Sequence, residues 1–383
     1  MIEIRKVDTD NKKQVKEFIQ FHYDLYKGNE FWVPPFRGDV GMMLNRKKHP
    51  FYLHSEADFF TAWKNGKMVG RIAALINRPF NEYHNEKVVS FFLFDAVNKQ
   101  EVVDALFDQV KNWGLERGMT KIVGPKGFSL FDGYGMLVSG FNKRQTMNMS
   151  AYNFPYYQTL VENYGLQKVN DFLTMGFDLK TYEIPEKVVR VAEIVKKRGV
   201  LHVLTLKSRK ELYARAREIA RLYAKTFENN WEYFPLIDAE IDFLIENVIK
   251  LVSLDMVKFI TNTDGDMVGF LLTFPDMSAA MQRHNGYLTP FLIADMLIEM
   301  KRTRSAALNG VGILEEYRNK GGDALLMHEM WGILKGSGRF VDGEAVQMAE
   351  SAKEVQREMA GLGLKPTKRH RVYQMEIAEE AAS

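Results

Sequence analysis

The sequence predicts a mixed α/β fold built from two copies of one unit, and three observations lead to this prediction. The segment NGKMVG, from Asn65, recurs as DGDMVG from Asp264, an offset of 199, and Gly165 recurs as Gly363 with an offset of 198. Strands and helices are expected in the same order in both halves. The second half also contains a strand, a glycine turn and a helix in residues 306–334. Two tandem domains are therefore predicted, at residues 1–183 and 199–383.

The elements of the first half follow from the spacing of apolar residues. Alternation indicates strands, three-to-four spacing indicates helices, and Asn65 followed by Gly66 is a favoured hairpin turn. The expected order is a strand at 2–7, a helix at 12–26, a hairpin at 59–76, another strand, a central helix from 104, a strand at 121–124, a helix at 156–164 and a strand at 172–179.

The second half repeats this order with one insertion. Its expected elements are a strand at 201–206, a helix at 209–227, a hairpin at 256–274, a helical insertion at 277–300, a strand at 306–313, a helix from 323, a strand at 340–348, a helix at 352–361 and a strand at 370–377. The linker is expected near residues 181–200, where a short helix is also possible. The pattern predicts a mixed sheet with helices on both faces.

The segment that joins the strand near residues 306–313 to the next helix carries the strongest chemical signal. Gly321 and Gly322 stand at the helix start, and Arg318 and Lys320 precede them. The first turn of a helix has unpaired amide donors and a partial positive charge, so glycines with nearby cations suit a pyrophosphate. An ordinary strand-to-helix turn with a solvated basic edge is the alternative.

These residues resemble motif A of the GNAT superfamily, the acyl-CoA-dependent N-acyltransferases, whose usual pattern is RxxGxG or RxxGxA after a strand. Asp323 replaces the usual small residue, and Ala324 follows it. The resemblance implies acetyl-CoA or another acyl-CoA as co-substrate, bound by Val311, Gly312, Ile313, Arg318, Asn319, Lys320, Gly321, Gly322, Asp323 and Ala324.

Longer segments extend the resemblance over nearly the whole chain. FENNWEYFPL (227–236), EYRNKGGDALL (316–326) and KRHRVYQMEI (368–377) are similar to an uncharacterised bacterial branch of tandem GNAT-like proteins. The resemblance implies two tandem domains of the acyl-CoA N-acyltransferase fold. In the first half Val102 and Val103 stand where the glycines stand in the second, so the first half is expected to have a structural or substrate-shaping role.

Catalysis by acyl transfer needs a polarised carbonyl and a path for the amine proton. Glu344 and Glu350 fall on one face of the strand predicted near 340–350, and either carboxylate is a candidate base. A solvated strand edge is the alternative. Tyr373 is a candidate acid, although tyrosine in a strand is more often packing. The tyrosine of GNAT motif B is replaced by Val161 and Met359 in the two halves.

The acceptor is expected to be a small-molecule or peptide amine. Trp231, Tyr233 and Phe234 lie between two predicted helices, where acceptor-binding loops occur in the superfamily, but they also fit a hydrophobic core. Asp132 lies in the glycine-rich stretch 125–150, which is either a loop over a site or a packed connector. The eight histidines show no metal-ligand spacing, so no metal is expected.

Composition sets the remaining expectations. The 383 residues include 46% hydrophobic and 26% charged residues, no cysteine and a net charge of +3. Absence of cysteine and a charged start favour a cytoplasmic protein. The near-neutral charge makes a nucleic-acid partner unexpected, and no apolar segment is long enough to suggest a membrane partner.

Two other functions compete with an N-acyltransferase. A tandem GNAT scaffold could bind an acyl-CoA without catalysis, since both motif B tyrosines are missing. A Fem-type aminoacyl-tRNA-dependent transferase would need a nucleic-acid surface, for which basic clusters at 196–198, 301–304 and 368–371 are available. The glycine turn argues for CoA over tRNA, because Fem-type transferases do not bind CoA.

Overall fold

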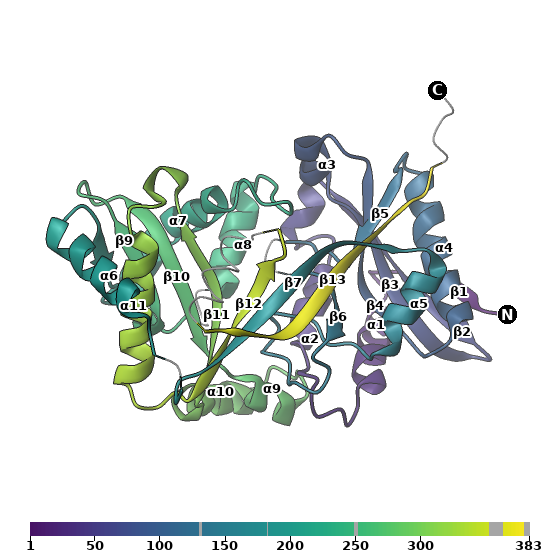
Figure 1. The fold of residues 1–383 in the computed structure, drawn as a ribbon. Helices are drawn as coiled ribbons and strands as arrows, with labels where there is room; N and C mark the ends of the chain where they lie inside the picture. Colours follow the sequence, from purple (N-terminus) through teal and green to yellow (C-terminus); the bar gives the residue numbers. More distant parts are fainter. Residues whose placement is uncertain (130–131, 182, 249–251, 352–362, 379–383) are drawn as a thin grey trace.

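The structure, a computed structural model, describes residues 1–129, 132–181, 183–248, 252–351 and 363–378. Within these ranges one sheet of 13 strands runs through both halves of the chain, and helices cover both of its faces (Figure 1). The mixed α/β fold predicted from the sequence is confirmed.

The first half begins at the outer edge of the sheet and ends near its middle. Its elements are β1 (Glu3–Lys6), α1 (Lys12–Leu25), α2 (Arg37–Met43), η1 (Pro50–Leu53), β2 (Glu56–Lys64), β3 (Lys67–Ile76), α3 (Arg78–His84), β4 (Val88–Ala96), α4 (Gln100–Leu115), β5 (Lys121–Gly124), β6 (Met136–Ser139), α5 (Tyr156–Tyr164) and β7 (Gln167–Asp178).

The second half repeats this plan after a linker helix, α6 (Glu186–Arg198). Its elements are β8 (His202–Leu204), α7 (Arg209–Thr226), α8 (Asp238–Val248), η3 (Leu254–Met256), β9 (Val257–Thr261), β10 (Met267–Pro275), α9 (Ser278–His284), α10 (Pro290–Arg302), β11 (Ser305–Ile313), η4 (Glu315–Tyr317), α11 (Gly322–Gly336), β12 (Asp342–Ala349) and β13 (Lys365–Glu376). The helix expected at 352–361 lies outside the described residues.

The closing strand of each half lies in the other half's part of the sheet. The strand order is β1-β2-β3-β4-β5-β13-β7-β12-β11-β10-β9-β8. β13 from the second half pairs with β5 and β7, while β7 from the first half pairs with β12. In Figure 1 the last strand returns across the molecule into the first half. The halves are therefore joined by exchanged strands as well as by the linker.

Charged side chains hold the two exchanged strands together. Asp171 on β7 has a fully buried carboxylate that accepts hydrogen bonds from Arg369 at 3.0 Å and Arg371 at 2.8 Å on β13. These cations lower the pKa of Asp171 against the opposing effect of burial, the largest single influence on that group. Val372 and Tyr373 of β13 are fully buried.

Each half buries apolar side chains on both faces of the sheet. In the first half, α4 and α5 cover one face and α1 and α2 the other. In the second half, α6 and α11 cover one face, while α7, α9 and α10 cover the other. The expected insertion at 277–300 forms α9 and α10, and the expected linker helix becomes part of the core through Ala192 and Val195. Among the described residues, no helix has the length and apolar character needed to span a bilayer.

Candidate functional site

The sheet opens between two parallel strands of the second half. β11 and β12 pair from Ser305 and Asp342 to Leu308 and Ala345. Beyond this point β11 continues along β10 to Ile313, and β12 continues along β7 to its end. The two strands therefore separate, and among the residues that the structure describes, none pairs with the backbone of β11 after Leu308 on the β12 side.

Irregular backbone accompanies the separation of these strands. Gly310 has a φ of 125°, which side chains with a Cβ rarely adopt, and the pairing of β10 with β11 shifts register nearby. Gln347 on β12 has a φ of 59° and lies within a second register shift, against β7. These two irregularities lie on opposite sides of the opening and turn the strands apart.

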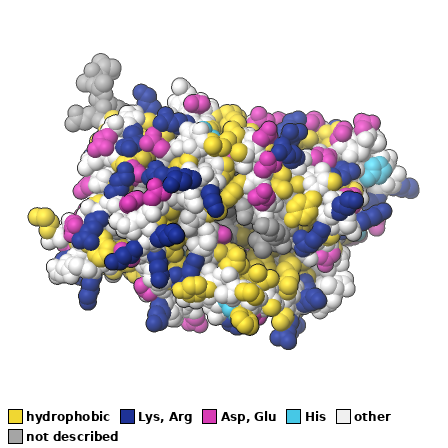
Figure 2. Space-filling model, turned by 180° about the vertical axis from the view of Figure 1, so that it is seen from behind, with side chains coloured by type: hydrophobic (Ala, Val, Ile, Leu, Met, Phe, Trp, Pro, Cys, Tyr) yellow, Lys and Arg dark blue, Asp and Glu magenta, His cyan; other side chains and the backbone are white. Residues whose placement is uncertain are grey.

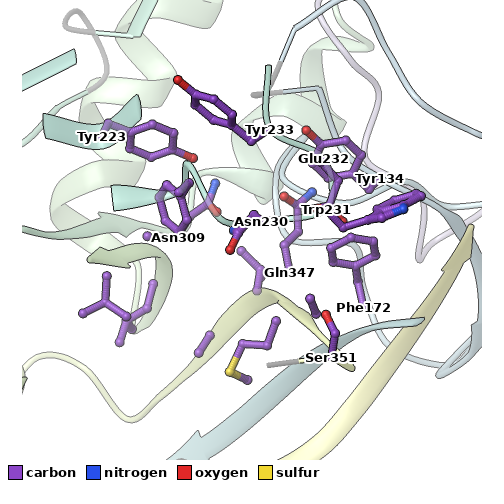
Figure 3. Close-up of a pocket in the computed structure, with 18 of the residues that line it drawn as sticks. Tyr134, Phe172, Tyr223, Asn230, Trp231, Glu232, Tyr233, Asn309, Gln347 and Ser351 are labelled. Carbon is purple, nitrogen blue, oxygen red and sulfur yellow. The ribbon is translucent and has the colours of Figure 1, made fainter. Parts of the chain in front are cut away.

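A cleft of about 430 Å³ occupies the opening. Its walls come from both halves of the chain: Tyr134 and Phe172 from the first, and Tyr223, Phe227, Asn229, Asn230, Trp231, Glu232, Tyr233, Leu271, Leu308, Asn309, Gly310, Val311, Met327, Ala345, Val346, Gln347, Met348, Ala349 and Ser351 from the second. Figure 3 shows Tyr134, Trp231 and Phe172 gathered on one side and Tyr223 on the other. A cleft lined by apolar and aromatic side chains, with polar groups such as Asn309 and Gln347 among them, is typical of a small-molecule site.

The predicted cofactor turn leaves the same end of β11. Gly321 stands before α11 with a left-handed φ of 80°, and Asn319 is left-handed too, with a φ of 59°. Arg318 and Lys320 are exposed beside the turn. The helix start supplies amide donors and partial positive charge, which fits a phosphate group. The turn suited to phosphate and the apolar cleft therefore both lie toward the carboxyl end of β11.

Some of the glycines in this region serve packing. A Cβ on Gly312 would lie 2.2 Å from Cγ2 of Thr226, so glycine lets α7 lie close to β11. A Cβ on Gly321 would lie 2.7 Å from Cγ2 of Val195, because α6 covers that side of the turn. The remaining predicted residues differ in accessibility: Val311 lines the cleft, Gly322 and Ala324 are buried, Asp323 is exposed and Ile313 packs into the core beneath the turn.

The matching turn of the first half has a different surface. Val102 and Val103 are buried in the core around α4, and Glu101 forms an ion pair with Lys64. The residue that caps the start of α4, Lys99, has extended backbone, whereas the residue that caps the start of α11, Gly321, is left-handed. This turn presents no glycine for a close phosphate contact.

Glu232 is a candidate base that sequence reasoning missed. Its residue is 6% exposed, it lines the cleft, and its Oε1 atom has no hydrogen-bond partner among the described residues. Burial raises the pKa of this carboxyl, while the charge of Lys126 opposes the shift. A buried carboxylate with a raised pKa inside a cleft is a candidate for proton transfer. A carboxylate between Trp231 and Tyr233, in a loop expected to contact the acceptor, was the available sequence signal.

The segment around Glu232 is held by the first half of the chain. The Lys126 ammonium lies 3.4 Å from the ring centroid of Phe80 and 4.9 Å from that of Trp231. His84 lies 2.8 Å from the carbonyl oxygen of Tyr233. Trp231 and Tyr233 line the cleft, as the acceptor prediction requires, whereas Phe234 is buried in the core with Phe80 and Tyr134. The first half therefore shapes this wall.

Glu344 lies outside the cleft, so its predicted role as a base there needs correction. It belongs to the paired part of β12, opposite Ala307, and lines a separate depression. Its carboxylate accepts hydrogen bonds from Thr146 at 2.5 Å and Thr367 at 2.9 Å and forms an ion pair with Lys368. Burial acts to raise the pKa of Glu344, but the Lys368 charge and these hydrogen bonds lower it overall. The contacts give Glu344 a structural role.

Replacing Lys368 by methionine is expected to destabilise the protein strongly. The Lys368 side chain is 3% exposed, so Lys368→Met leaves the Glu344 carboxylate without its counter-charge in a mostly buried place. Loss of one partner of a buried pair costs about 3–5 kcal/mol in the free energy of unfolding. Urea unfolding measures this change. Lys365→Met, at the exposed start of the same strand, is the control and should have little effect; equal stability of both variants would contradict the structural role.

Glu350 and Tyr373 also lie outside the cleft. Glu350 forms an ion pair with Lys168 at 2.5 Å on the first half's closing strand. Tyr373 donates a hydrogen bond to Glu162 at 3.0 Å and is buried in the core around α4. The sequence pattern placed Tyr373 in a strand, but strand exchange carries that strand into the first half. An acid role for Tyr373 in the cleft is therefore corrected.

Asp132 lines a cavity of the first half and does not line the cleft between β11 and β12, although Tyr134, two residues later, does. Its carboxylate accepts backbone hydrogen bonds from Phe128 at 2.6 Å and Ser129 at 2.8 Å. Burial raises its pKa to about 6. Asp132 lines a cavity of about 310 Å³ together with His22 and Asp95, so its predicted contact with the acceptor in the second half is not supported by position. Within the described ranges, no three His, Asp or Glu side chains gather as a metal site.

The chain has a tandem GNAT-like fold. It aligns over 99% of its length with 100% of a tandem GNAT protein from the clavulanic acid biosynthesis pathway, with a TM-score of 0.54 and 10% sequence identity. A GCN5-related N-acetyltransferase from Sphaerobacter thermophilus aligns over 99% of this chain and 96% of its own, with a TM-score of 0.53 and 14% identity. At these identities the likeness shows the fold alone.

Two particular proteins are distantly similar in sequence. Protein YghO of Escherichia coli is 26% identical over 376 residues, which cover 96% of this chain and 94% of that protein. The bacterial ceramide synthase of Caulobacter vibrioides is 26% identical over 310 residues, which cover 80% of this chain and 79% of that protein. No family model matches the chain.

Proposed function

We propose that the protein is an acyl-CoA-dependent N-acyltransferase whose cleft between β11 and β12 holds the thioester. One observation carries the proposal: the parallel strands separate beside a helix-start turn suited to phosphate, and the opening is lined by the buried carboxylate of Glu232, whose Oε1 has no hydrogen-bond partner in the described part of the chain. The turn would hold the diphosphate, the free backbone of β11 would pair with the pantetheine arm, and the aromatic wall would contact the acceptor.

The residues of the cleft fit the transfer of an acyl group to an amine. The amine nitrogen attacks the thioester carbonyl carbon, a C–N bond forms and the C–S bond breaks. The nitrogen gives its proton to Glu232, and the thiolate leaves and takes up a proton from water. A thiol with a pKa of about 8.5 leaves without full protonation, so a motif B tyrosine is dispensable.

The acceptor proposed here is a long-chain amine. A ceramide is an amide of such an amine, so the name of the Caulobacter relative supports N-acyl transfer. The apolar and aromatic lining of the cleft also suits an alkyl chain better than a charged peptide. Acetyl-CoA and longer acyl-CoAs both remain candidate donors, and amide products from a panel of donors and amines, identified by mass spectrometry, would distinguish them.

Acyl-CoA is expected to stabilise the protein against heat, and the basic side chains of the turn are expected to be required. A ligand that binds only the folded state raises the free energy of unfolding by about 2.7 kcal/mol when its concentration is about 100 times its Kd. Arg318→Glu combined with Lys320→Glu should remove the rise in Tm, because both side chains are exposed and the exchange opposes phosphate. Lys207→Glu with Lys210→Glu, equally exposed on the same half, is the control.

Three results, from Tm shifts, product analysis and tRNA binding, would decide between the competing functions. No Tm shift with acyl-CoA, or an equal shift in the Arg318 and Lys320 variant, would contradict the assigned cofactor site. A shift without any amide product would favour a non-catalytic scaffold. Retention on aminoacyl-tRNA without a response to CoA would favour the Fem-type transferase.

A further inference from the structure

Hydrophobic side chains gather on the surface of the helical insertion α9–α10. Six of the 13 exposed large hydrophobic residues in the described chain lie in the short stretch 287–298, namely Tyr287, Leu288, Phe291, Ile293, Leu297 and Ile298. Phe291 is 78% exposed. Such a concentration on one segment of a surface marks an interaction site.

The helix α10 turns this apolar surface outward by its own geometry. Leu292 and Met296, four residues apart, are buried against the core and fix the inner side of the helix. Leu297, Ile298 and Lys301 then fall on the opposite side, because each residue advances by about 100° around a helix of 3.6 residues per turn. The side chain of Thr289 caps the start of α10 by accepting a hydrogen bond from the Leu292 amide at 3.2 Å.

The outward surface of the insertion carries positive charge, because its acidic side chains are neutralised within the insertion. Asp295 and Glu299, the acidic residues of α10, are both bound by Arg283 of α9, at 2.8 and 2.6 Å. Lys301 and Arg302 at the end of the helix are exposed, and in the described part of the chain neither side chain forms an ion pair. Figure 2 shows hydrophobic side chains with Lys and Arg beside them along the lower edge of the molecule, over α9 and α10.

We propose that α10 lies on the surface of an anionic lipid bilayer. A helix with exposed Phe and Leu on one face and basic residues beside them binds at the boundary between headgroups and acyl chains, and anionic lipids add to the attraction. Such a helix needs neither a spanning segment nor a large net charge, which is why the near-neutral composition and the absence of an apolar span suggested no membrane partner. The outward side of α10 pairs an apolar face with unneutralised cations.

The charge pattern favours a lipid surface over other occupants. Nucleic acid would neutralise Lys301 and Arg302 but would leave Phe291 and Leu297 in water. A second copy of this chain, paired through the same face about a two-fold axis, would bring like charges to one interface without an acidic partner on the outward face. Phosphatidylglycerol headgroups with their acyl chains match both features.

Co-sedimentation with lipid vesicles tests this proposal on the full-length protein. We expect binding to vesicles of phosphatidylcholine with phosphatidylglycerol, and weaker binding to phosphatidylcholine alone or at high salt. Phe291→Ser combined with Leu297→Ser should lower the bound-to-free ratio at least about tenfold, because two exposed apolar side chains that would be buried among the lipids are lost. Lys301→Glu combined with Arg302→Glu should remove the preference for anionic vesicles.

The controls separate binding to a lipid surface from non-specific adhesion, misfolding and self-association. Leu53→Ser, at an apolar residue that is 69% exposed elsewhere, should leave vesicle binding unchanged. Circular dichroism and Tm should match the parent for every variant, because the replaced side chains are exposed.

Absence of binding to anionic vesicles, or undiminished binding by the Phe291 and Leu297 variant, would overturn the proposal. A dimer in light scattering that this variant dissociates would identify a second copy as the occupant. Since binding is measured without turnover, the result is independent of the proposed acyl transfer.

Discussion

Glu232→Gln is expected to lower kcat for amide formation by about 10²–10⁴-fold, the range for loss of a general acid or base. The amide keeps the size of the carboxylate but cannot accept the proton of the attacking amine. Acyl-CoA should still raise Tm in this variant, because the turn before α11 is unchanged. Single-turnover kinetics with a bound acyl-CoA measures the chemical step directly.

The dependence of kcat on pH gives a second readout of the same residue. A base acts in its deprotonated form, so the rate should rise with pH as Glu232 loses its proton and then level off; burial raises this pKa to about 7. Lys126→Met removes the charge that favours the carboxylate, and the rise should move to higher pH. A residue with only a structural role would not move the profile.

Glu228→Gln is the matched control, because Glu228 is an exposed carboxylate four residues earlier that does not line the cleft. It should keep the parent rate and pH profile. Full turnover by Glu232→Gln, with an unchanged profile, would show that the proton leaves by another route.

The local parts of this structure could be predicted from sequence because they depend on neighbours in the chain. The hairpins at Asn65 and Asp264, the start of α11 at Gly321 and the helices of the insertion all follow from turn residues and periodicity. The tandem GNAT-like fold was accessible for the same reason, since its order of elements repeats along the chain.

The positions of the predicted catalytic residues depend on which strands pair with one another, and the periodicity of a sequence does not encode strand pairing. An alternating pattern placed Tyr373 in a strand but could not name the strand beside it, and the exchange puts Tyr373 in the first half. Glu344 was placed in the predicted strand, but its partners Thr146 and Lys368 come from distant segments. Glu232 became a candidate base only because the fold buries it beside Lys126, a residue of the first half.

The exchange of closing strands predicts that a cut between the halves leaves them together. A protease site inserted between residues 180 and 186 interrupts only the covalent link, while β13 stays between β5 and β7. After cleavage, both fragments should elute as one species in size-exclusion chromatography and unfold in one transition. Separation of the fragments under native conditions would contradict the exchanged arrangement.

A chain that stops after residue 364 should fail to fold, in contrast to the cleaved protein. Removing β13 takes fully buried Val372 and Tyr373 out of the core, each worth about 1.5–3 kcal/mol, and the buried ion pairs of Asp171 are lost as well. Domains are stable by only about 5–15 kcal/mol, so these losses suffice to unfold it. The truncation also exposes the edges of β5 and β7, which favours aggregation. Because the same strands carry Phe172 into the cleft and join its two walls, loss of acyl-CoA binding should accompany loss of the folded state.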